Sequence, residues 1–280
     1  MRRFRTHTVK NRRRFNSKGQ RILSEIIKKR CTLRIYIGYI FIGKSDIGKV
    51  RRLNEDSFGI REIAKGAFLV AVCDGMGGAN GGNIASETAA KTVSDQIKMS
   101  YRNEMSSNSI KYLLMSAITA ANSDVYDMAM KDESLSGMGT TVVAAIVING
   151  MAYIAHAGDS RAYVIGDNSI TQVTRDHSIV QSMIENGEIT EEEAKTHPNR
   201  NVITRALGVT EKIDIDYNEI QLDTDQSLLI CTDGLTNFVE NKQILEIIGN
   251  NKFYEYPEKL IEKANENGGG DNITVVMMSE

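Results

Sequence analysis

The sequence predicts an α+β fold in which paired helices pack outside antiparallel β-sheets. Apolar runs separated by Asn149-Gly150 and by Gly166-Asp167-Asn168 are typical of strands joined by hairpin turns. Apolar residues also recur with helical spacing in two pairs of segments that lie between the strand segments. Because an amphipathic helix must bury its apolar stripe, such pairs are expected to cover the outer faces of the sheets.

A basic arm precedes the folded part of the chain. Residues 1–34 hold 13 Lys or Arg and a single acidic residue, Glu25, whereas residues 35–280 hold 21 basic and 35 acidic residues. This uneven charge predicts a disordered N-terminal arm over residues 1–34 and one folded domain over residues 35–280. The arm is interpreted as a solvated tail, as residues added by a misplaced start codon, as a transit peptide, or as a contact for nucleic acid, anionic lipid or an acidic partner.

Three features of the sequence argue against a membrane protein, a phosphate-loop nucleotide site and a cysteine-bound metal. The apolar run over residues 35–42 is about eight residues long, whereas a membrane helix needs roughly 20, so no membrane span is expected. Residues 38–45, GYIFIGKS, match the G-x4-G-K-S phosphate-loop pattern, but bulky residues fill the loop and no helical pattern follows. Cys31, Cys73 and Cys231 are an odd number without metal-site spacing, which predicts reduced thiols and a cytoplasmic protein.

The next segment, residues 45–58, has the sequence SDIGKVRRLNEDSF and is expected to be a polar loop between two apolar runs. Arg51 precedes Glu55 and Asp56 by four and five residues. One cation and two carboxylates are therefore available at one strand end.

Residues 67–78, AFLVAVCDGMGG, follow with a continuous apolar run that ends at Asp74. Such a run predicts a strand buried on both faces, with the Asp74 carboxylate at its tip. Gly75 and the glycines after it would let the backbone turn sharply and its carbonyl groups approach a bound group closely.

The middle of the chain contains helices and then strands. Helices are expected over residues 84–99 and 110–130, and a three-strand antiparallel meander over residues 140–174. A polar break, GDSR at residues 158–161, interrupts the meander and is typical of a bulge or turn. A short helix is expected over residues 177–186, and a Thr190 and Glu193 capping box is expected to open a second helix. An irregular basic flap is expected over residues 197–208. The C-terminal part is expected to form a hairpin over residues 220–232, helices over 241–248 and 256–267, and a core strand over 273–278.

Three aspartates stand at strand ends that lie far apart in the sequence. Asp233 follows an apolar run, as Asp74 does, and Asp271 precedes the last apolar run. If the fold brings them together, their carboxylates repel one another unless a cation offsets the charge. Oxygen ligands without nearby pairs of Cys or His favour magnesium or manganese over zinc.

Eight motifs, taken in order, resemble those of a known family. They are SDIGKVRRLNEDSF, VCDGMGG, GMGTT, HAGDSRAY, TRDHS, HPNRNVITRALG, CTDGL and GGGDNIT. At these separations they resemble the metal-dependent, type 2C (PPM-type) protein serine/threonine phosphatases of bacteria, over about residues 40–280. The resemblance implies a four-layer αββα sandwich, two antiparallel β-sheets flanked by helix pairs, with a two-metal site at one end of the sheets.

The resemblance also implies metal ligands. Asp74 would bridge both metals, and the carbonyl of Gly75 would bind one of them. Asp233 and Asp271 would hold the other metal. Asp132, five residues before Gly137, would share a third metal with Asp233, as in many bacterial members.

Two further roles follow from the same resemblance. Asp56, with Glu55 beside it, would act mainly through metal-bound water. Arg51 would bind the substrate phosphate with its forked donors. Met76 stands where eukaryotic members carry a His that could protonate the leaving alkoxide, so the sequence does not name that acid. His156 lies in a strand pattern, where a His is more often a hydrogen-bonded structural residue.

The implied function is the hydrolysis of phosphoserine and phosphothreonine on proteins. A hydroxide bridging two Mn²⁺ or Mg²⁺ ions would attack phosphorus directly, without a covalent phospho-enzyme. The implied partners are phosphorylated proteins, including a cognate bacterial serine/threonine kinase and its substrates. The bacterial character of the motifs argues against a transit peptide in the arm.

Two alternatives are weighed against this function. A phosphoprotein-binding pseudophosphatase with weak or no activity would be expected to have lost a ligand, whereas Asp74, Asp233 and Asp271 are all present. A two-metal phosphodiesterase would share the carboxylates. It should also have a basic groove, whereas basic residues here are concentrated in the arm and at residues 197–205.

Overall fold

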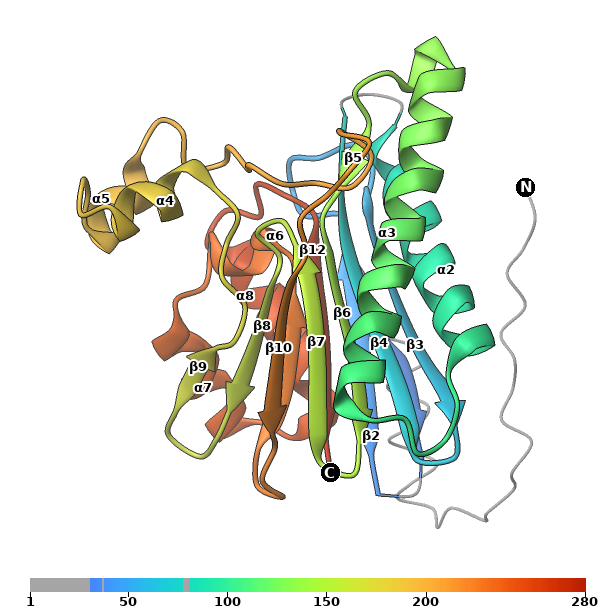
Figure 1. Ribbon diagram of the computed structural model, residues 1–280. Coiled ribbons are helices and arrows are strands. Elements are labelled where there is room, and N and C mark those ends of the chain that lie inside the picture. Colours follow the sequence, from blue (N-terminus) through green and yellow to red (C-terminus); the bar gives the residue numbers. More distant parts are fainter. Residues whose placement is uncertain (1–30, 37, 78–80) are drawn as a thin grey trace.

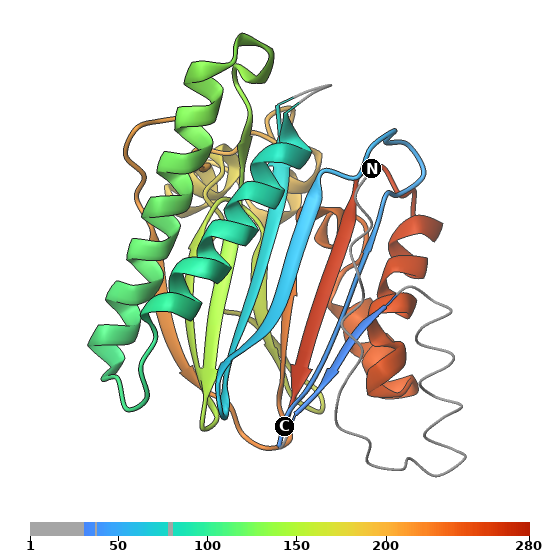
Figure 2. The same cartoon turned by 90° about the vertical axis from the view of Figure 1, so that its right-hand side faces the viewer.

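The computed structural model describes residues 31–36, 38–77 and 81–280 of the chain. Two β-sheets lie face to face between two helical layers (Figures 1 and 2). One helical layer contains α2 (Gly82–Ser100) and α3 (Ser107–Lys131), and the other contains α7 (Asn241–Asn250) and α8 (Tyr256–Glu266). The predicted α+β sandwich with helix pairs outside two antiparallel sheets is confirmed.

The first sheet includes both ends of the described chain. Its strands are antiparallel, and β12 lies in the middle between β2 and β11. In spatial order they are β1 (Thr32–Ile35), β2 (Ile40–Asp46), β12 (Ile273–Ser279), β11 (Ser227–Cys231), β8 (Arg161–Ile165) and β9 (Ile170–Gln172). β1 begins within the segment assigned to the basic arm, and residues 1–30 of that arm lie outside the described residues.

The second sheet is formed by the central part of the chain. In spatial order its strands are β10 (Asp216–Gln221), β7 (Met151–Ala157), β6 (Val142–Ile148), β4 (Ala67–Met76) and β3 (Asp56–Ala64). The short strand β5 (Gly139–Thr140) pairs with the last residues of β4. β4 lies between β6 and β3, which explains why its apolar run does not alternate with polar residues.

Three apolar layers hold the sandwich together. Side chains of α2 and α3 pack on the second sheet at the spacing that the helical pattern predicted, and Ala89, Val93 and Ile118 are fully buried there. The space between the sheets is filled by alternate residues of both, including Phe41 and Phe68, whose ring centroids are 5.2 Å apart. The other face of the first sheet packs against α7 and α8.

Two predicted strand pairings are wrong. The third strand of the expected meander is β8, and it pairs with β11 in the first sheet, whereas β6 and β7 pair in the second. The chain crosses between the sheets at Gly158, whose φ of +113° takes it out of the strand conformation. Likewise β10 and β11 do not form a hairpin, since they lie in different sheets.

The remaining elements are short. α4 (Ile179–Glu185) and α5 (Glu191–Thr196) project from one end of the sandwich, and the predicted capping box of α5 is present (Figure 1). The others are η2 (Glu133–Leu135), α6 (Asp233–Thr236) and η3 (Phe253–Glu255). Residues 197–208 are largely irregular, as expected.

Two exclusions can be compared with the structure. Residues 40–45 of the phosphate-loop match lie in strand β2, so they form an extended strand in place of a phosphate loop. Among the described residues, no helix is both long and apolar enough to cross a membrane.

Candidate metal centre

Two aspartates of the second sheet lie side by side at its end. Asp56 is the first residue of β3, and the strand register places it directly opposite Asp74 of β4. Side chains of directly opposed residues point to the same face of a sheet and lie about 5 Å apart at Cβ. The buried strand β4 thus brings the Asp74 carboxylate next to a second carboxylate.

The first sheet supplies the other aspartates at the same end. Asp233 begins α6 directly after β11, and Asp271 precedes β12, which pairs with β11. Asp56 connects the two sheets, because its Oδ2 accepts hydrogen bonds from the hydroxyl groups of Thr232 (2.9 Å) and Thr274 (2.6 Å). The fold therefore brings together four aspartates from segments far apart in the sequence.

The clustered carboxylates make each other harder to ionise. Burial, followed by the charges of Asp233 and Asp271, raises the pKa of Asp56 to about 7, against the hydrogen bonds from the two threonines. Burial and then the charge of Asp56 raise the pKa of Asp74 well above its ordinary value. Burial and then the charge of Asp271 raise the pKa of Asp233, whose carboxyl group also bonds that of Asp74.

The site fits a hard divalent cation. Asp56 Oδ1 is buried and has no hydrogen-bond partner, although a buried oxygen of this kind normally has one. Positive charge placed among these carboxylates would offset their repulsion and satisfy that oxygen. Asp56, Asp74, Asp233 and Asp271 are the residues that could hold it.

Gly75 could add a backbone ligand. A Cβ on this residue would lie 2.1 Å from the carbonyl oxygen of Gly82 and 2.5 Å from that of Glu55. No larger residue fits without moving the start of α2. The glycine therefore lets β4, the β2–β3 loop and α2 meet at the aspartates.

Arg51 lies at the rim. Its Nη2 donates to Asp271 Oδ2 at 2.7 Å, and about half of its side chain is exposed. Glu55 is partly buried behind it, and its backbone amide donates to Asn272 Oδ1 at 2.8 Å. A guanidinium group beside the carboxylates and open to solvent can reach a phosphate that approaches the cluster.

Asp132 is not brought into this cluster by any interaction that the described residues show. It is exposed at the end of α3, and its Oδ1 accepts hydrogen bonds from the amide (2.9 Å) and hydroxyl (2.6 Å) of Ser134. Its role in a third metal site stays a prediction.

Asp159 was missed as a site residue by reasoning from the sequence, which interpreted the GDSR break as a bulge or turn. Burial and then the charge of Asp233 raise the pKa of Asp159 to about 8. Its neighbour Ser160 hydrogen bonds Thr141 (2.7 Å), whose hydroxyl accepts from the Asp74 amide at 3.0 Å. A polar residue at the crossing between two sheets was the signal that could have identified this position.

His156 belongs to a separate buried cluster. Its ring stacks on that of His177 with centroids 4.9 Å apart, and His177 Nε2 lies 3.3 Å from Asp216 Oδ2. The three side chains offer donor atoms within 4.8 Å of one another. Arg205 already supplies a positive charge there, since its Nη1 donates to Asp216 Oδ1 at 2.7 Å and lies 3.1 Å from His177 Nε2. The packing favours the structural role expected for His156.

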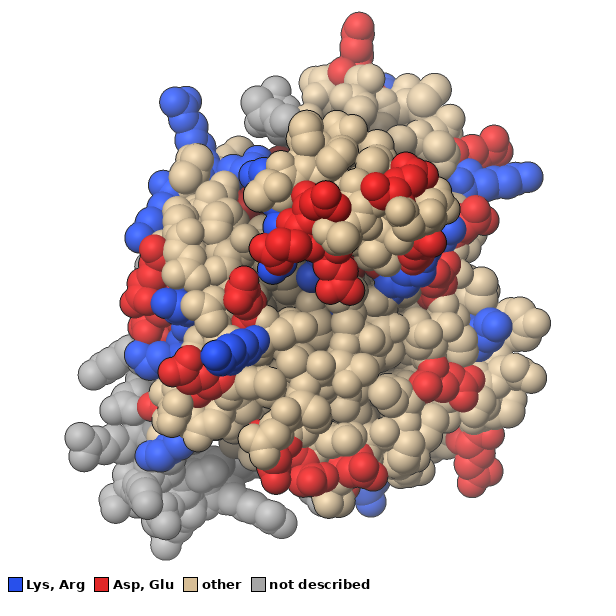
Figure 3. Space-filling view, turned by 90° about the vertical axis from the view of Figure 1, so that its left-hand side faces the viewer, with Lys and Arg blue, Asp and Glu red and all other residues tan. Residues whose placement is uncertain are grey.

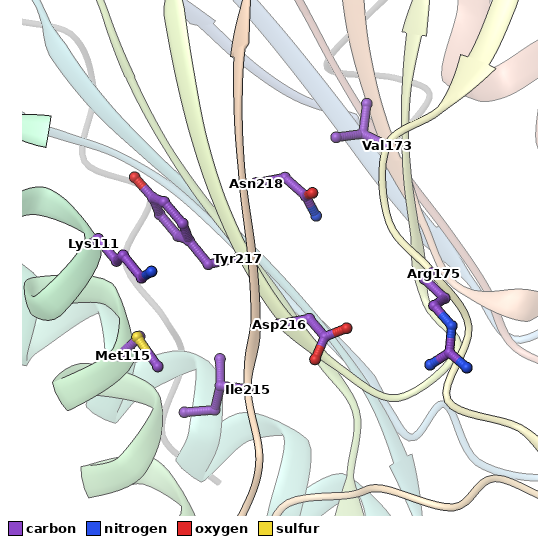
Figure 4. Close-up of a pocket in the computed structure, with 8 residues that line it drawn as sticks. All are labelled: Lys111, Met115, Val173, Arg175, Ile215, Asp216, Tyr217 and Asn218. Carbon is purple, nitrogen blue, oxygen red and sulfur yellow. The ribbon is translucent and has the colours of Figure 1, made fainter. Parts of the chain in front are cut away.

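A pocket of about 440 Å³ opens beside this second cluster (Figure 4). Lys111 and Met115 of α3 lie on one side of it, Arg175 on the other, and Asp216 between them. None of the site residues predicted from the sequence lines it.

The unit formed by α4 and α5 is acidic on its surface. Figure 3 shows acidic side chains gathered on this projecting unit. Its exposed members are Glu185, Glu188, Glu191, Glu192 and Glu193. This surface does not resemble the basic groove expected of a phosphodiesterase acting on nucleic acid.

Comparison with known proteins identifies relatives over most of the chain. Residues 42–274 match the family model described as protein phosphatase 2C. The chain is 38% identical over 236 residues to the serine/threonine phosphatase stp of Listeria welshimeri serovar 6b, which covers 84% of this chain and 93% of that protein. It is 33% identical over 241 residues to the protein phosphatase PhpP of Streptococcus pneumoniae serotype 2, with 84% and 95% covered.

Solved structures agree with this similarity. The serine/threonine phosphatase Stp1 from Staphylococcus aureus superimposes with a TM-score of 0.81 at 33% identity, covering 86% of this chain and 94% of that chain. The catalytic domain of the serine threonine protein phosphatase PstP, solved with two manganese ions, has a TM-score of 0.75 at 32% identity, with 86% and 97% covered.

Proposed function

The chain belongs to the protein phosphatase 2C family, and on that basis we propose that its clustered aspartates hydrolyse phosphoserine and phosphothreonine on proteins. The activity of the family is metal-dependent, and phosphorylated proteins are the substrates. One observation carries the proposal: carboxylates from β3, β4, the end of β11 and the start of β12 lie at one end of the sandwich. A pseudophosphatase and a phosphodiesterase are not favoured.

We propose two Mn²⁺ or Mg²⁺ ions as the cofactor. Asp74 and the carbonyl of Gly75 would hold one of them, and Asp74, Asp233 and Asp271 the other. Asp132 would share a third ion with Asp233. When bound, the ions lower the pKa of water and neutralise charge on the phosphoryl group. The unpartnered Oδ1 of Asp56 and the mutual repulsion of the carboxylates support this assignment.

The side chains around the ions position the substrate and the attacking water. Arg51 is held by Asp271 and can donate to the phosphate oxygens, which carry more negative charge in the transition state. Thr232 and Thr274 fix Asp56, whose free Oδ1 can accept a hydrogen from water. Water attacks phosphorus in line, the bond to the serine or threonine oxygen breaks, and that oxygen takes up a proton. Met76 has no proton to donate.

Release of phosphate from a phosphothreonine peptide tests the function. The assay compares the full chain with Asp74→Asn, first with manganese and then with excess chelator. We expect release that needs metal and is lost in the variant. If a folded wild-type protein released no phosphate with metal, the chain would have a binding role only.

We also propose the targets of the phosphatase and its location in the cell. A cognate serine/threonine kinase and its substrates are the phosphoproteins we propose as targets, because the similar proteins are serine/threonine phosphatases. A cytoplasmic location is supported by Cys73 and Cys231, which are buried in strands β4 and β11 and form no disulfide in the described structure.

A further inference from the structure

The β2–β3 loop, residues 47–55, exposes three aliphatic side chains to water. Ile47 is 38% exposed, Val50 67% and Leu53 54%. The described part of the chain has ten large hydrophobic residues with exposed side chains, and these three fall within seven consecutive positions. Single exposed apolar residues are ordinary on a protein surface, whereas a group of them marks an interaction site.

The loop is firmly held, so the exposure does not result from a loose backbone. Asn272 Nδ2 donates to the carbonyl oxygens of Ile47 (3.0 Å) and Leu53 (2.9 Å). The Lys49 amide donates to the Gly269 carbonyl oxygen at 2.7 Å. These bonds fasten the loop to the segment before β12.

The same loop forms a wall of the aspartate site. Gly48 has a φ of +77°, and a Cβ on it would lie 2.1 Å from the carbonyl oxygen of Asp271, so its backbone rests directly on that residue. Arg51, next to Val50 in the chain, donates to the Asp271 carboxylate at 2.7 Å. Val50 and Leu53 therefore stand within two residues of the side chain that is proposed to bind the substrate phosphate, on a loop that rests on Asp271.

We propose that Val50 and Leu53, with Ile47 beside them, bind an aliphatic side chain of the phosphoprotein one or two residues from the phosphorylated residue. The inference rests on the proposed function and narrows its substrate class. Consecutive Cα atoms are 3.8 Å apart, so residues one or two positions from the phosphorylated one lie within about 8 Å of it. When Arg51 holds the phosphate, the flanking residues of the substrate pass over its neighbours in the loop.

The charge of the loop further restricts which residues of the substrate can flank the phosphorylated one. Lys49 and Arg52 are also exposed, so basic flanking residues are repelled. An aliphatic neighbour instead removes its own surface and that of Val50 and Leu53 from water. An acidic residue gains only a screened surface attraction, which is weak at physiological salt.

The test uses two phosphothreonine peptides that differ only at the two positions on each side of the phosphothreonine, leucine in one and serine in the other. The enzymes are the wild type, the double variant Val50→Ser/Leu53→Ser, and Met99→Ser as the control. Met99 is 71% exposed in the last turn of α2, about 25 Å along the helix from Gly82 beside the site. p-Nitrophenyl phosphate serves as a small substrate without flanking residues.

We expect the wild type to prefer the leucine peptide by about tenfold in kcat/KM, mainly through KM, since partial burial of a leucine contributes an amount of this order. The double variant should lose most of that preference. It should keep its rate on p-nitrophenyl phosphate, and Met99→Ser should behave as the wild type on all three substrates.

The outcomes separate this inference from the proposed function. If the folded wild type hydrolyses none of the substrates with metal, the proposed function fails. If it hydrolyses p-nitrophenyl phosphate but treats the two peptides alike, or if the double variant keeps the preference, the inference about the loop is wrong. Binding to phosphatidylglycerol vesicles is measured for the wild type and the double variant as well. If the double variant loses vesicle binding but keeps the peptide preference of the wild type, the loop is a membrane contact and the proposal is overturned.

Discussion

Replacing Asp56 by Asn should stabilise the metal-free protein and at the same time abolish its activity. Burial, with the charges of Asp233 and Asp271, raises the pKa of Asp56 from its ordinary 3.8 to about 7. Each pKa unit corresponds to about 1.4 kcal/mol, so keeping this carboxylate ionised costs the folded metal-free protein on the order of 4 kcal/mol above pH 7. The amide oxygen of Asn can still accept the bonds from Thr232 and Thr274.

The stability gained by Asp56→Asn should depend on pH. A carboxyl group whose pKa is raised by folding binds its proton more tightly in the folded state, so the wild type loses stability as pH rises from about 4 to about 7. The advantage of Asp56→Asn should therefore be close to zero near pH 4, about 2 kcal/mol near pH 5.5 and about 4 kcal/mol near pH 8.

Urea unfolding in excess chelator at these three pH values measures the effect. Asp95→Asn is the control, because the pKa of Asp95 is lowered by hydrogen bonds from Lys91 and Arg61, so its replacement should not stabilise the protein at any pH. Added manganese at 100 times its Kd stabilises the wild type by about 2.7 kcal/mol, so it should reverse the order of the wild type and Asp56→Asn near pH 5.5 and narrow their difference near pH 8. If Asp56→Asn were less stable than the wild type near pH 8 without metal, the reasoning from repulsion would be refuted.

The other predictions concern the reaction and the histidine cluster. Asp74→Asn and Asp233→Asn should each lower phosphatase activity at least about 100-fold with an unchanged circular dichroism spectrum, because they remove charge proposed to hold metal; full metal-dependent activity in Asp233→Asn would disprove the assignment. Arg51→Ala should raise KM about tenfold with a smaller change in kcat, as expected for one charge-assisted hydrogen bond to phosphate, and steady-state kinetics will show it. Burial lowers the pKa of both His156 and His177, so in the folded protein they stay neutral at a pH where the same groups in the unfolded chain are protonated. Proton uptake by the unfolded chain then favours unfolding. The stability of the manganese-loaded protein should therefore fall as pH drops below about 6.5, by at most about 1.4 kcal/mol per pH unit for each His, and a stability that rose over this range would contradict their buried neutral state.

Reasoning from the sequence succeeded where local pattern decides the structure. Continuous apolar character identified β4 and its terminal Asp74, and helical spacing identified α2 and α3. Bulky residues at 38–45 excluded a phosphate loop, and the structure has strand β2 there. In each case the side chains of a short segment determine its own backbone conformation and burial.

Reasoning from the sequence failed where the structure depends on which strands pair with each other. β8 follows β7 closely in sequence but pairs with β11, and β10 lies in a different sheet from β11. Strands bond through backbone groups that are alike at every residue, so a strand pattern does not name its partner. Asp159 was missed for the same reason, because its burial near Asp233 arises only when the chain crosses between the sheets.

The sequence by itself determined most of the helices and strands, the residue types of the proposed metal ligands and, through eight ordered motifs, the family. Tertiary structure alone decided which strands are neighbours, that Asp56 joins the two sheets through Thr232 and Thr274, and that the loop carrying Arg51 exposes three aliphatic side chains. The physical reason is that ligand chemistry belongs to single side chains. Burial, mutual repulsion and exposure instead depend on distances between residues that are remote in the chain.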